Sequence, residues 1–156
     1  NLVYENPINR NAGLDIHENP IKNHQYLITV DVARGLGNDY SAFLVFDITE
    51  FPYKVVGKYR NNEIKPMLFP NVIFDIANAY NKAFILVEVN DIGGQIADAL
   101  HYDLEYENII MTWVGDFNPK MLKLIEGLGA TDYQKLKTYR LLFDKNANFE
   151  RYPIHS

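Results

Sequence analysis

The order of the apolar runs constrains the fold of this chain more than any other feature. Three β-rich runs follow one another closely, at residues 26–32, 42–48 and 53–59. Short gaps between such runs favour consecutive antiparallel strands. Helix-like and strand-like segments then alternate over residues 69–113. Because that alternation is typical of parallel strands joined by helical crossovers, the sequence predicts a mixed sheet with helices packed on it.

The alternating part of the chain has clear periodicities. Over residues 69–80, apolar side chains recur at the three- and four-residue spacing of a helix buried along one side. Residues 84–89 form a nearly continuous apolar run, which is typical of a strand covered on both faces. A second helical stripe covers 92–104, and 109–113 predicts a fifth strand. A capping-box pattern predicts a further helix at 131–143.

This element order predicts an α/β domain with a ribonuclease H-like fold. Its mixed five-stranded sheet would have three antiparallel strands, then parallel strands, flanked by helices. Residues 1–24 are polar and show no period, so we interpret them as an N-terminal arm or linker. Residues 25–156 are then a single domain, which a hydrophobic content of 47% is able to support. Fold order alone does not determine function.

Composition narrows the classes of function. The chain has no cysteine, which excludes disulfides and zinc-thiolate sites. No stretch approaches the roughly 20 consecutive apolar residues that a membrane-spanning helix needs. The net charge of −5 argues against a protein coated in nucleic acid, because phosphate contacts need Lys and Arg. A nuclease remains compatible with this charge, since an acidic metal site can lie beside a local basic strip.

Two carboxylates lie at the ends of predicted strands. Asp31 ends the first strand and Glu88 lies near the end of the fourth, each after an apolar run. An ionised carboxylate buried without a partner is costly, so a compensating cation is expected. Because these two strands are neighbours in the predicted sheet, the carboxylates should converge. Carboxylate oxygens suit Mg²⁺ or Mn²⁺, and two such ions about 3.5–4 Å apart activate water and stabilise the leaving oxygen of a phosphodiester.

Simpler structural interpretations exist for each acid taken alone. Asp31 could cap a turn, and Glu88 could face water from an edge strand. In the glycine-rich loop 34–39, Asp39 is either an auxiliary metal ligand or a residue that tightens the turn. The same loop fits the backbone phosphate grip of actin-like and sugar-kinase ATPases. The absence of an internal repeat in 156 residues argues against that fold.

A basic cluster surrounds the third predicted strand. It consists of Lys54, Lys58, Arg60 and Lys65, and the first three are the candidate DNA-binding residues. Taken singly, each cation is explained as part of a solvated face. As a cluster beside an acidic metal site, they are candidates for contacts with a DNA backbone.

Two blocks of this sequence resemble a known family. They are HQYLITVD at 24–31 followed by GLGNDYSA at 35–42, and FILVEVN at 84–90. Both resemble the nuclease domain of the large terminase subunit of T-even-type tailed bacteriophages, as does LEYE at 104–107. The strand–Asp–Gly-x-Gly-x-Asp-Tyr arrangement of the first block is the most specific part. The resemblance covers roughly residues 20–112.

The resemblance implies a metal-dependent endonuclease domain of a phage DNA-packaging terminase large subunit, which cuts concatemeric viral DNA. The implied cofactors are Mg²⁺ or Mn²⁺, as two ions. Asp31 and Glu88 would be the first two members of the acidic triad, and Asp39 matches a further acidic position. The implied partners are double-stranded DNA, the portal and the small terminase subunit, with no membrane. The implied location is the cytoplasm of the infected bacterial host.

Two departures from the family pattern matter. The chain lacks a Gly-x-x-x-x-Gly-Lys-Ser/Thr phosphate loop, so the ATPase motor domain is expected upstream. The third acid is not identified, because Asp116, Asp132 and Asp144 all lack the family's context. The nuclease domain is therefore expected to be truncated at its C-terminus. The alternative function is a catalytically incomplete module that grips DNA or docks on a partner in the packaging machine.

Overall fold

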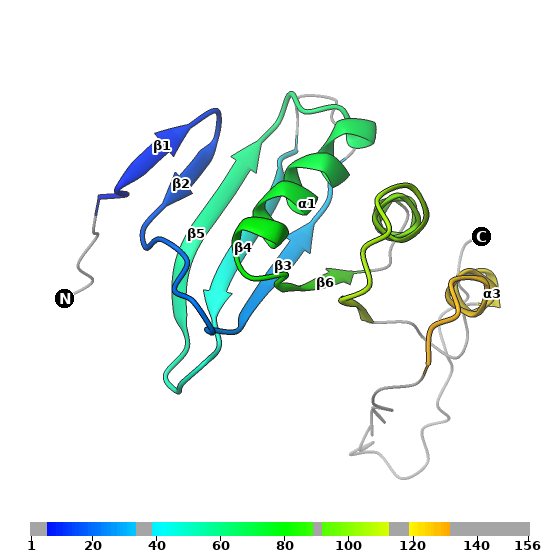
Figure 1. Ribbon diagram of the computed structural model, residues 1–156. Helices are drawn as coiled ribbons and strands as arrows, with labels where there is room; N and C mark the ends of the chain where they lie inside the picture. The colour runs from blue at the N-terminus through cyan, green and yellow to red at the C-terminus, as the bar shows by residue number, and fades with distance from the viewer. Residues whose placement is uncertain (1–5, 34–38, 89–91, 113–118, 132–156) are drawn as a thin grey trace, which may run out of the picture.

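A computed structural model describes residues 6–33, 39–88, 92–112 and 119–131 of the chain (Figure 1). Among these residues, seven strands form one sheet in the order β1-β2-β5-β4-β3-β6-β7. The strands are β1 (Asn9–Asn11), β2 (Leu14–Ile16), β3 (Tyr26–Asp31), β4 (Ser41–Asp47), β5 (Lys54–Asn61), β6 (Phe84–Glu88) and β7 (Ile109–Thr112). The helical segments are η1 (Pro66–Leu68), α1 (Phe69–Ala79), α2 (Gly93–Asp98), η2 (Ala99–Asp103) and α3 (Pro119–Gly127).

The predicted strand directions are confirmed. Strand β4 pairs antiparallel with both β3 and β5. Strand β6 runs parallel to β3, and β7 runs parallel to β6. Each parallel partner is reached through a helical crossover, as the alternation of helix-like and strand-like segments predicted. The sheet is therefore mixed, with its antiparallel part first along the chain.

The predicted number of five strands is wrong, because two more lie in the stretch predicted as an arm. Strands β1 and β2 form a hairpin, and β2 pairs with the edge of β5. Each has only three residues, too few for a period-two pattern to be recognised. The hairpin turns at Ala12 and Gly13, both with positive φ. A Cβ at Gly13 would lie 2.5 Å from the Arg60 carbonyl oxygen, so a larger residue cannot approach β5 there.

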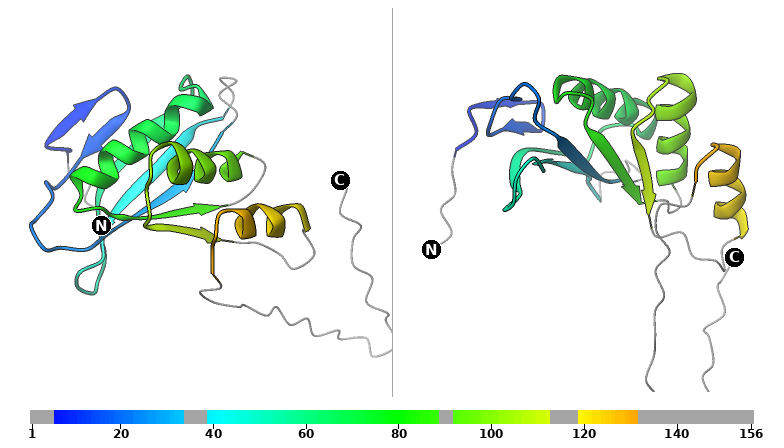
Figure 2. Two further views of the ribbon diagram at one scale, coloured as in Figure 1. Left: turned by 45° about the vertical axis from the view of Figure 1, so that its right-hand side comes forward. Right: turned by 60° about the horizontal axis from the view of Figure 1, so that its bottom comes forward.

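Helix α1 covers one face of the sheet, and α2 lies on the same side of it (Figures 1 and 2). The apolar stripe that predicted this helix faces inward, with Phe69, Ile73 and Ala77 fully buried. Below it, the rings of Phe43 and Tyr59 stack with Phe69 at centroid distances of 6.2 and 5.7 Å. This aromatic layer closes the core between α1 and the antiparallel strands.

The second helical segment is less regular than predicted. The stripe predicted a continuous helix over 92–104, whereas α2 ends at Asp98 and η2 continues as a π-helix. Beyond it, the Tyr106 hydroxyl donates to the Ala83 carbonyl oxygen, which ties the crossover back to the start of β6. Burial raises the pKa of Tyr106 to about 12, so this donor keeps its proton. Helix α3 follows β7, and the helix predicted over 131–143 lies almost wholly outside the described residues. No described helix is long and apolar enough to cross a membrane.

The two faces of the sheet are covered unequally within the described part of the chain. In β6, Ile85 and Val87 are fully buried beneath the helices. On the opposite face, Phe84 is 40% exposed and Leu44 of β4 is 38% exposed. The run at 84–89 predicted cover on both faces, but the described helices cover only one. The less covered face is the one that carries Asp31 and Glu88.

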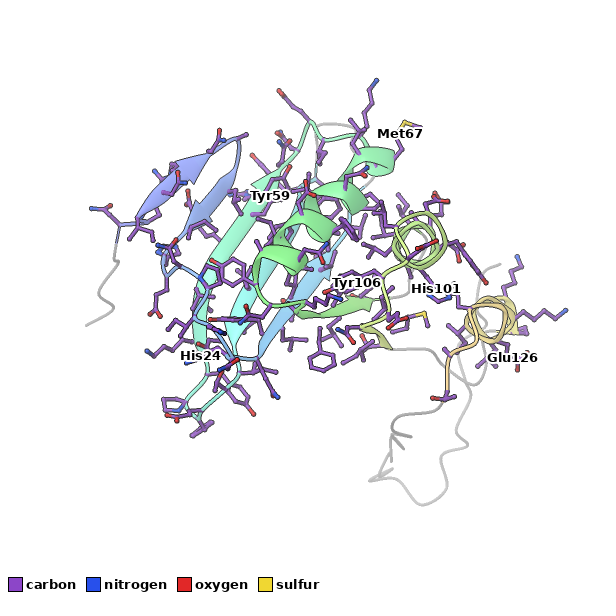
Figure 3. All side chains as sticks on the ribbon, viewed as in Figure 1. His24, Tyr59, Met67, His101, Tyr106 and Glu126 are labelled. Carbon is purple, nitrogen blue, oxygen red and sulfur yellow. The ribbon has the colours of Figure 1, made fainter. Side chains whose placement is uncertain are left out.

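Two carboxylates are held by polar contacts away from that pair. Asp47 is the last residue of β4 and pairs with Tyr26 at the start of β3. Its carboxylate accepts from the Thr49 backbone N–H at 3.0 Å and lies 2.6 Å from Nδ1 of His24, the residue labelled in Figure 3. Burial raises its pKa, but the hydrogen bonds of Thr49 and His24 outweigh burial and leave the pKa below its usual range. Asp15 accepts from Arg10 Nε at 2.6 Å, and this bond is the main reason that its pKa is lowered.

We expect acid to destabilise this fold through these two groups. Because their folded-state pKa values lie below the unfolded values, their stabilisation is present above the unfolded pKa of about 3.9 and is lost as pH falls through the folded pKa. The urea concentration at the unfolding midpoint should decrease as the pH is lowered from about 6 to about 3. This decrease should be smaller in Asp47→Asn. Asp75→Asn, on the exposed side of α1, is the matched control. An unchanged slope in Asp47→Asn would contradict the assignment.

Candidate active site

Asp31 and Glu88 lie side by side at the end of the parallel strand pair. Val30 of β3 pairs with Val87 of β6, so the next residue on each strand is one of the two acids. Adjacent strands are about 4.8 Å apart, and paired residues in a parallel ladder project to the same face. Asp31 and Glu88 therefore share one face, on neighbouring strands. The convergence predicted from the strand order is what this register produces.

The same row continues across the sheet in both directions. Asp31 pairs with Ala42 of β4, which in turn pairs with Arg60 of β5. On the other side, Glu88 pairs with Thr112 of β7. All five residues line one open groove of about 450 Å³ on the less covered face. Along this row, the groove carries the acids Asp31 and Glu88 toward one side and Arg60 toward the other. The small side chain of Ala42 lies between them.

Both carboxylates are exposed, and the premise that they are buried is wrong. The apolar residues before each acid alternate between the two faces, and only one set is buried. Burial therefore does not explain why a cation would be needed. The close approach of two like charges does, because like charges on paired strands repel. Neither carboxylate has an ion pair or a side-chain hydrogen bond with another described residue, so their oxygens are available to a cation.

Asp39 lies on the far side of the loop that follows β3. It is exposed and is not among the residues that line the groove. Ser41, the first residue of β4, is buried. The Ser41 hydroxyl accepts from the Ala33 backbone N–H at 3.2 Å. This contact joins the two ends of the loop that separates Asp31 from Asp39. In the sequence, Ser41 was noticed only as part of the family resemblance. Its place as a polar residue directly before the apolar run at 42–48 was the signal that could have identified it.

The predicted basic cluster is divided between two faces. Lys58 and Arg60 line the groove with the acids. Lys54 does not line it, and its ammonium lies 4.0 Å from the Glu18 carboxylate. The cause is a β-bulge in the β4–β5 ladder, which inserts one residue and reverses the alternation between Lys54 and Lys58. Four-residue spacing would otherwise have placed both lysines on one face.

Lys58 is shared with a second carboxylate. Its ammonium lies 3.3 Å from Asp15, which also holds the Arg10 guanidinium at 2.6 Å. Two cations share one carboxylate here, so the trio keeps a net positive charge. The side of the groove formed by β5, which carries Lys58 and Arg60, is therefore basic.

The third acid is not located in the described part of the chain. Asp116, Asp132 and Asp144 all lie outside the described residues. Within those residues, no group of three or more His, Asp or Glu side chains is placed to hold a metal ion. Among the described residues, the candidate site therefore has two adjacent acids, Asp31 and Glu88, with Asp39 outside the groove.

A family comparison places this arrangement in context. The model of the terminase RNaseH-like domain matches residues 28–127, a span that contains both acids. This chain belongs to the terminase RNaseH-like domain family. The recognition of a terminase domain with a ribonuclease H-like fold is thereby confirmed, whereas the narrower T-even assignment stays a prediction.

Solved structures agree with the fold of this terminase domain. The large terminase nuclease from thermophilic phage G20c with bound magnesium matches with a TM-score of 0.58 at 20% identity, covering 79% of this chain and 62% of that chain. The same nuclease with bound cobalt matches equally well. The nuclease domain of the Thermus phage P74-26 large terminase matches with a TM-score of 0.54 at 21% identity, covering 76% and 56%. The ribonuclease H-like fold is confirmed, and this chain spans about three fifths of these relatives.

The adjacent carboxylates should make the metal-free terminase domain less stable than its neutralised variant. In EDTA, Asp31→Asn removes one of two facing negative charges and should raise the melting temperature by about 1–3 °C. Mn²⁺ should raise the melting temperature of the wild-type domain more than that of the variant, because binding to the folded state stabilises it. Differential scanning fluorimetry measures both shifts.

Glu107→Gln is the matched control for this comparison. Glu107 is exposed and precedes β7, at the opposite end of that strand from Thr112. Its substitution should leave the response to Mn²⁺ unchanged. A lower melting temperature for Asp31→Asn in EDTA would contradict repulsion between Asp31 and Glu88.

Proposed function

We propose that this chain is the metal-dependent endonuclease domain of a phage DNA-packaging terminase large subunit, which cuts concatemeric viral DNA. The observation that carries the proposal is the adjacency of Asp31 and Glu88 at one end of the β3–β6 pair. Both residues lie inside the segment that matches the terminase RNaseH-like domain family. Two facing carboxylates that have no ion pair with another described residue are a set of hard oxygen donors for a divalent cation.

Asp31 and Glu88 are the residues that would hold Mg²⁺ or Mn²⁺. Asp31, at the centre of the row, and Glu88 beside it would both be ligands of the proposed two ions. Asp39 would be an auxiliary ligand that approaches from the loop. When bound, such cations supply an activated water and offset the charge that develops on the phosphodiester. Structures of the G20c nuclease with magnesium, cobalt or zinc support a divalent cation for this class of domain.

Lys58 and Arg60 would hold the DNA backbone against the opposite wall of the groove. Both line the same groove as the acids. Phosphate contacts carry no base information, so this arrangement supports cutting with little sequence preference. The remaining partners are proposed from the family: an upstream ATPase motor, the portal and the small terminase subunit. The site of action would be the cytoplasm of the infected bacterial host.

Plasmid nicking with Mn²⁺ tests the proposal. Loss of groups that merely support metal ligands typically costs 10–100-fold, so loss of a ligand itself should lower the nicking rate by at least about a hundredfold in Asp31→Asn and Glu88→Gln. Asp39→Asn should have a smaller effect. Glu107→Gln is again the control of equal charge change. Equal nicking by wild type and Asp31→Asn would remove Asp31 from the mechanism.

Calorimetric titration with Mn²⁺ separates cutting from simple DNA gripping. The proposed nuclease binds Mn²⁺, and binding weakens in Asp31→Asn. Retained DNA binding without measurable Mn²⁺ binding would overturn the endonuclease proposal. It would favour a catalytically incomplete module of the packaging machine.

A further inference from the structure

Arg60 has an unusual environment for a cation beside two acids. Its guanidinium carbon lies over the Tyr40 ring, 3.6 Å from the ring centroid, in a cation–π contact with the residue that precedes β4. Within the described residues, it forms no ion pair with any carboxylate. The nearest acid in its row is Asp31, two strands away across the small side chain of Ala42. Two strand spacings amount to roughly 10 Å.

Stacking leaves the hydrogen-bonding edge of Arg60 available. A cation–π contact uses the attraction between the charge and the ring face, and it does not consume the N–H donors of the guanidinium. Those donors match the paired oxygens of a phosphate. No ion pair joins Arg60 to Asp31 among the described residues, so Arg60 does not neutralise that carboxylate.

We infer that Tyr40 is a positioning residue that holds Arg60 ready to bind a backbone phosphate of the nucleic acid. This phosphate would lie next to the one that is placed at Asp31 and Glu88. This inference rests on the proposed function, since it assumes that a phosphodiester strand occupies the groove. The row from Arg60 through Asp31 to Glu88 crosses β5, β4, β3 and β6, so a strand lying along it meets the cation and the acids in turn. Tyr40 acts through Arg60 and does not itself contact the reacting phosphate.

The relation between Lys58 and Arg60 sharpens this assignment. Lys58 already has the Asp15 carboxylate at 3.3 Å, a partner that competes with phosphate. Arg60 has an aromatic ring as its partner, which does not neutralise its charge. A preorganised side chain also loses less conformational entropy when it binds. Arg60 is therefore the stronger phosphate contact of the two.

The test is the affinity of the full 156-residue chain for a short labelled double-stranded DNA in EDTA, where nothing is cut, measured over a series of salt concentrations. Arg60→Gln should raise Kd about tenfold and reduce the salt slope by about one. Tyr40→Leu should raise Kd about two- to fivefold, because the cation–π contact is lost. Tyr40→Phe keeps the ring and should bind as wild type does.

A double-mutant cycle separates positioning from a general structural role. If Tyr40 acts through Arg60, Tyr40→Leu should have no further effect in the Arg60→Gln background. Lys22→Gln is the control with the same charge change, since Lys22 is exposed and precedes β3, at the end opposite Asp31. Tyr40 is 40% exposed, so these variants should fold, and their melting temperatures check that they do.

Several outcomes would overturn the inference. Additive effects of the two substitutions would show that Tyr40 acts independently of Arg60. An unchanged salt slope in Arg60→Gln would exclude the phosphate contact. These failures differ from a failure of the proposed function, which would appear as wild-type protein that neither binds Mn²⁺ nor nicks plasmid.

Discussion

The pairing of β3 with both β4 and β6 is the constraint on which the rest of this structure depends. Ile28, Val30, Ile85 and Val87 are pressed against the helices on one face, at 0–6% exposure. Side chains alternate along a strand, so a slip of one residue would expose this apolar set. The same slip would move Asp31 beneath the helices. Burial of the apolar residues therefore fixes the face on which the acids lie.

That register also explains why acids and cations meet in one groove. Arg60 is aligned with Asp31 through the antiparallel pairings of β5 with β4 and of β4 with β3. Glu88 lies beside Asp31 because β6 pairs parallel with β3. The row therefore brings together strands from distant parts of the chain. Electrostatic repulsion between the two acids is compatible with folding because both are exposed, and the proposed divalent cation would offset it. The groove is thus a product of apolar packing on its opposite face.

Much of the fold and part of the candidate site could be predicted from local patterns. The stripe of α1 and the apolar run of β6 are long enough to be recognised, whereas the three-residue strands β1 and β2 are not. The burial of Asp31 was predicted wrongly because an apolar run does not say which face is covered. Lys54 was grouped with Lys58 because a β-bulge leaves no clear mark in the residue types.

Periodicity and strand length are local properties, so the residue pattern was enough to predict the order of the elements, the strand directions and the acids at two strand ends. The motif around Asp31 was also sufficient to recognise the terminase family. Tertiary structure alone decided that Arg60 stacks on Tyr40 and that Lys54 faces away from the groove. These outcomes depend on ladder register and on which face the helices cover, and both are set by contacts between residues far apart in the chain.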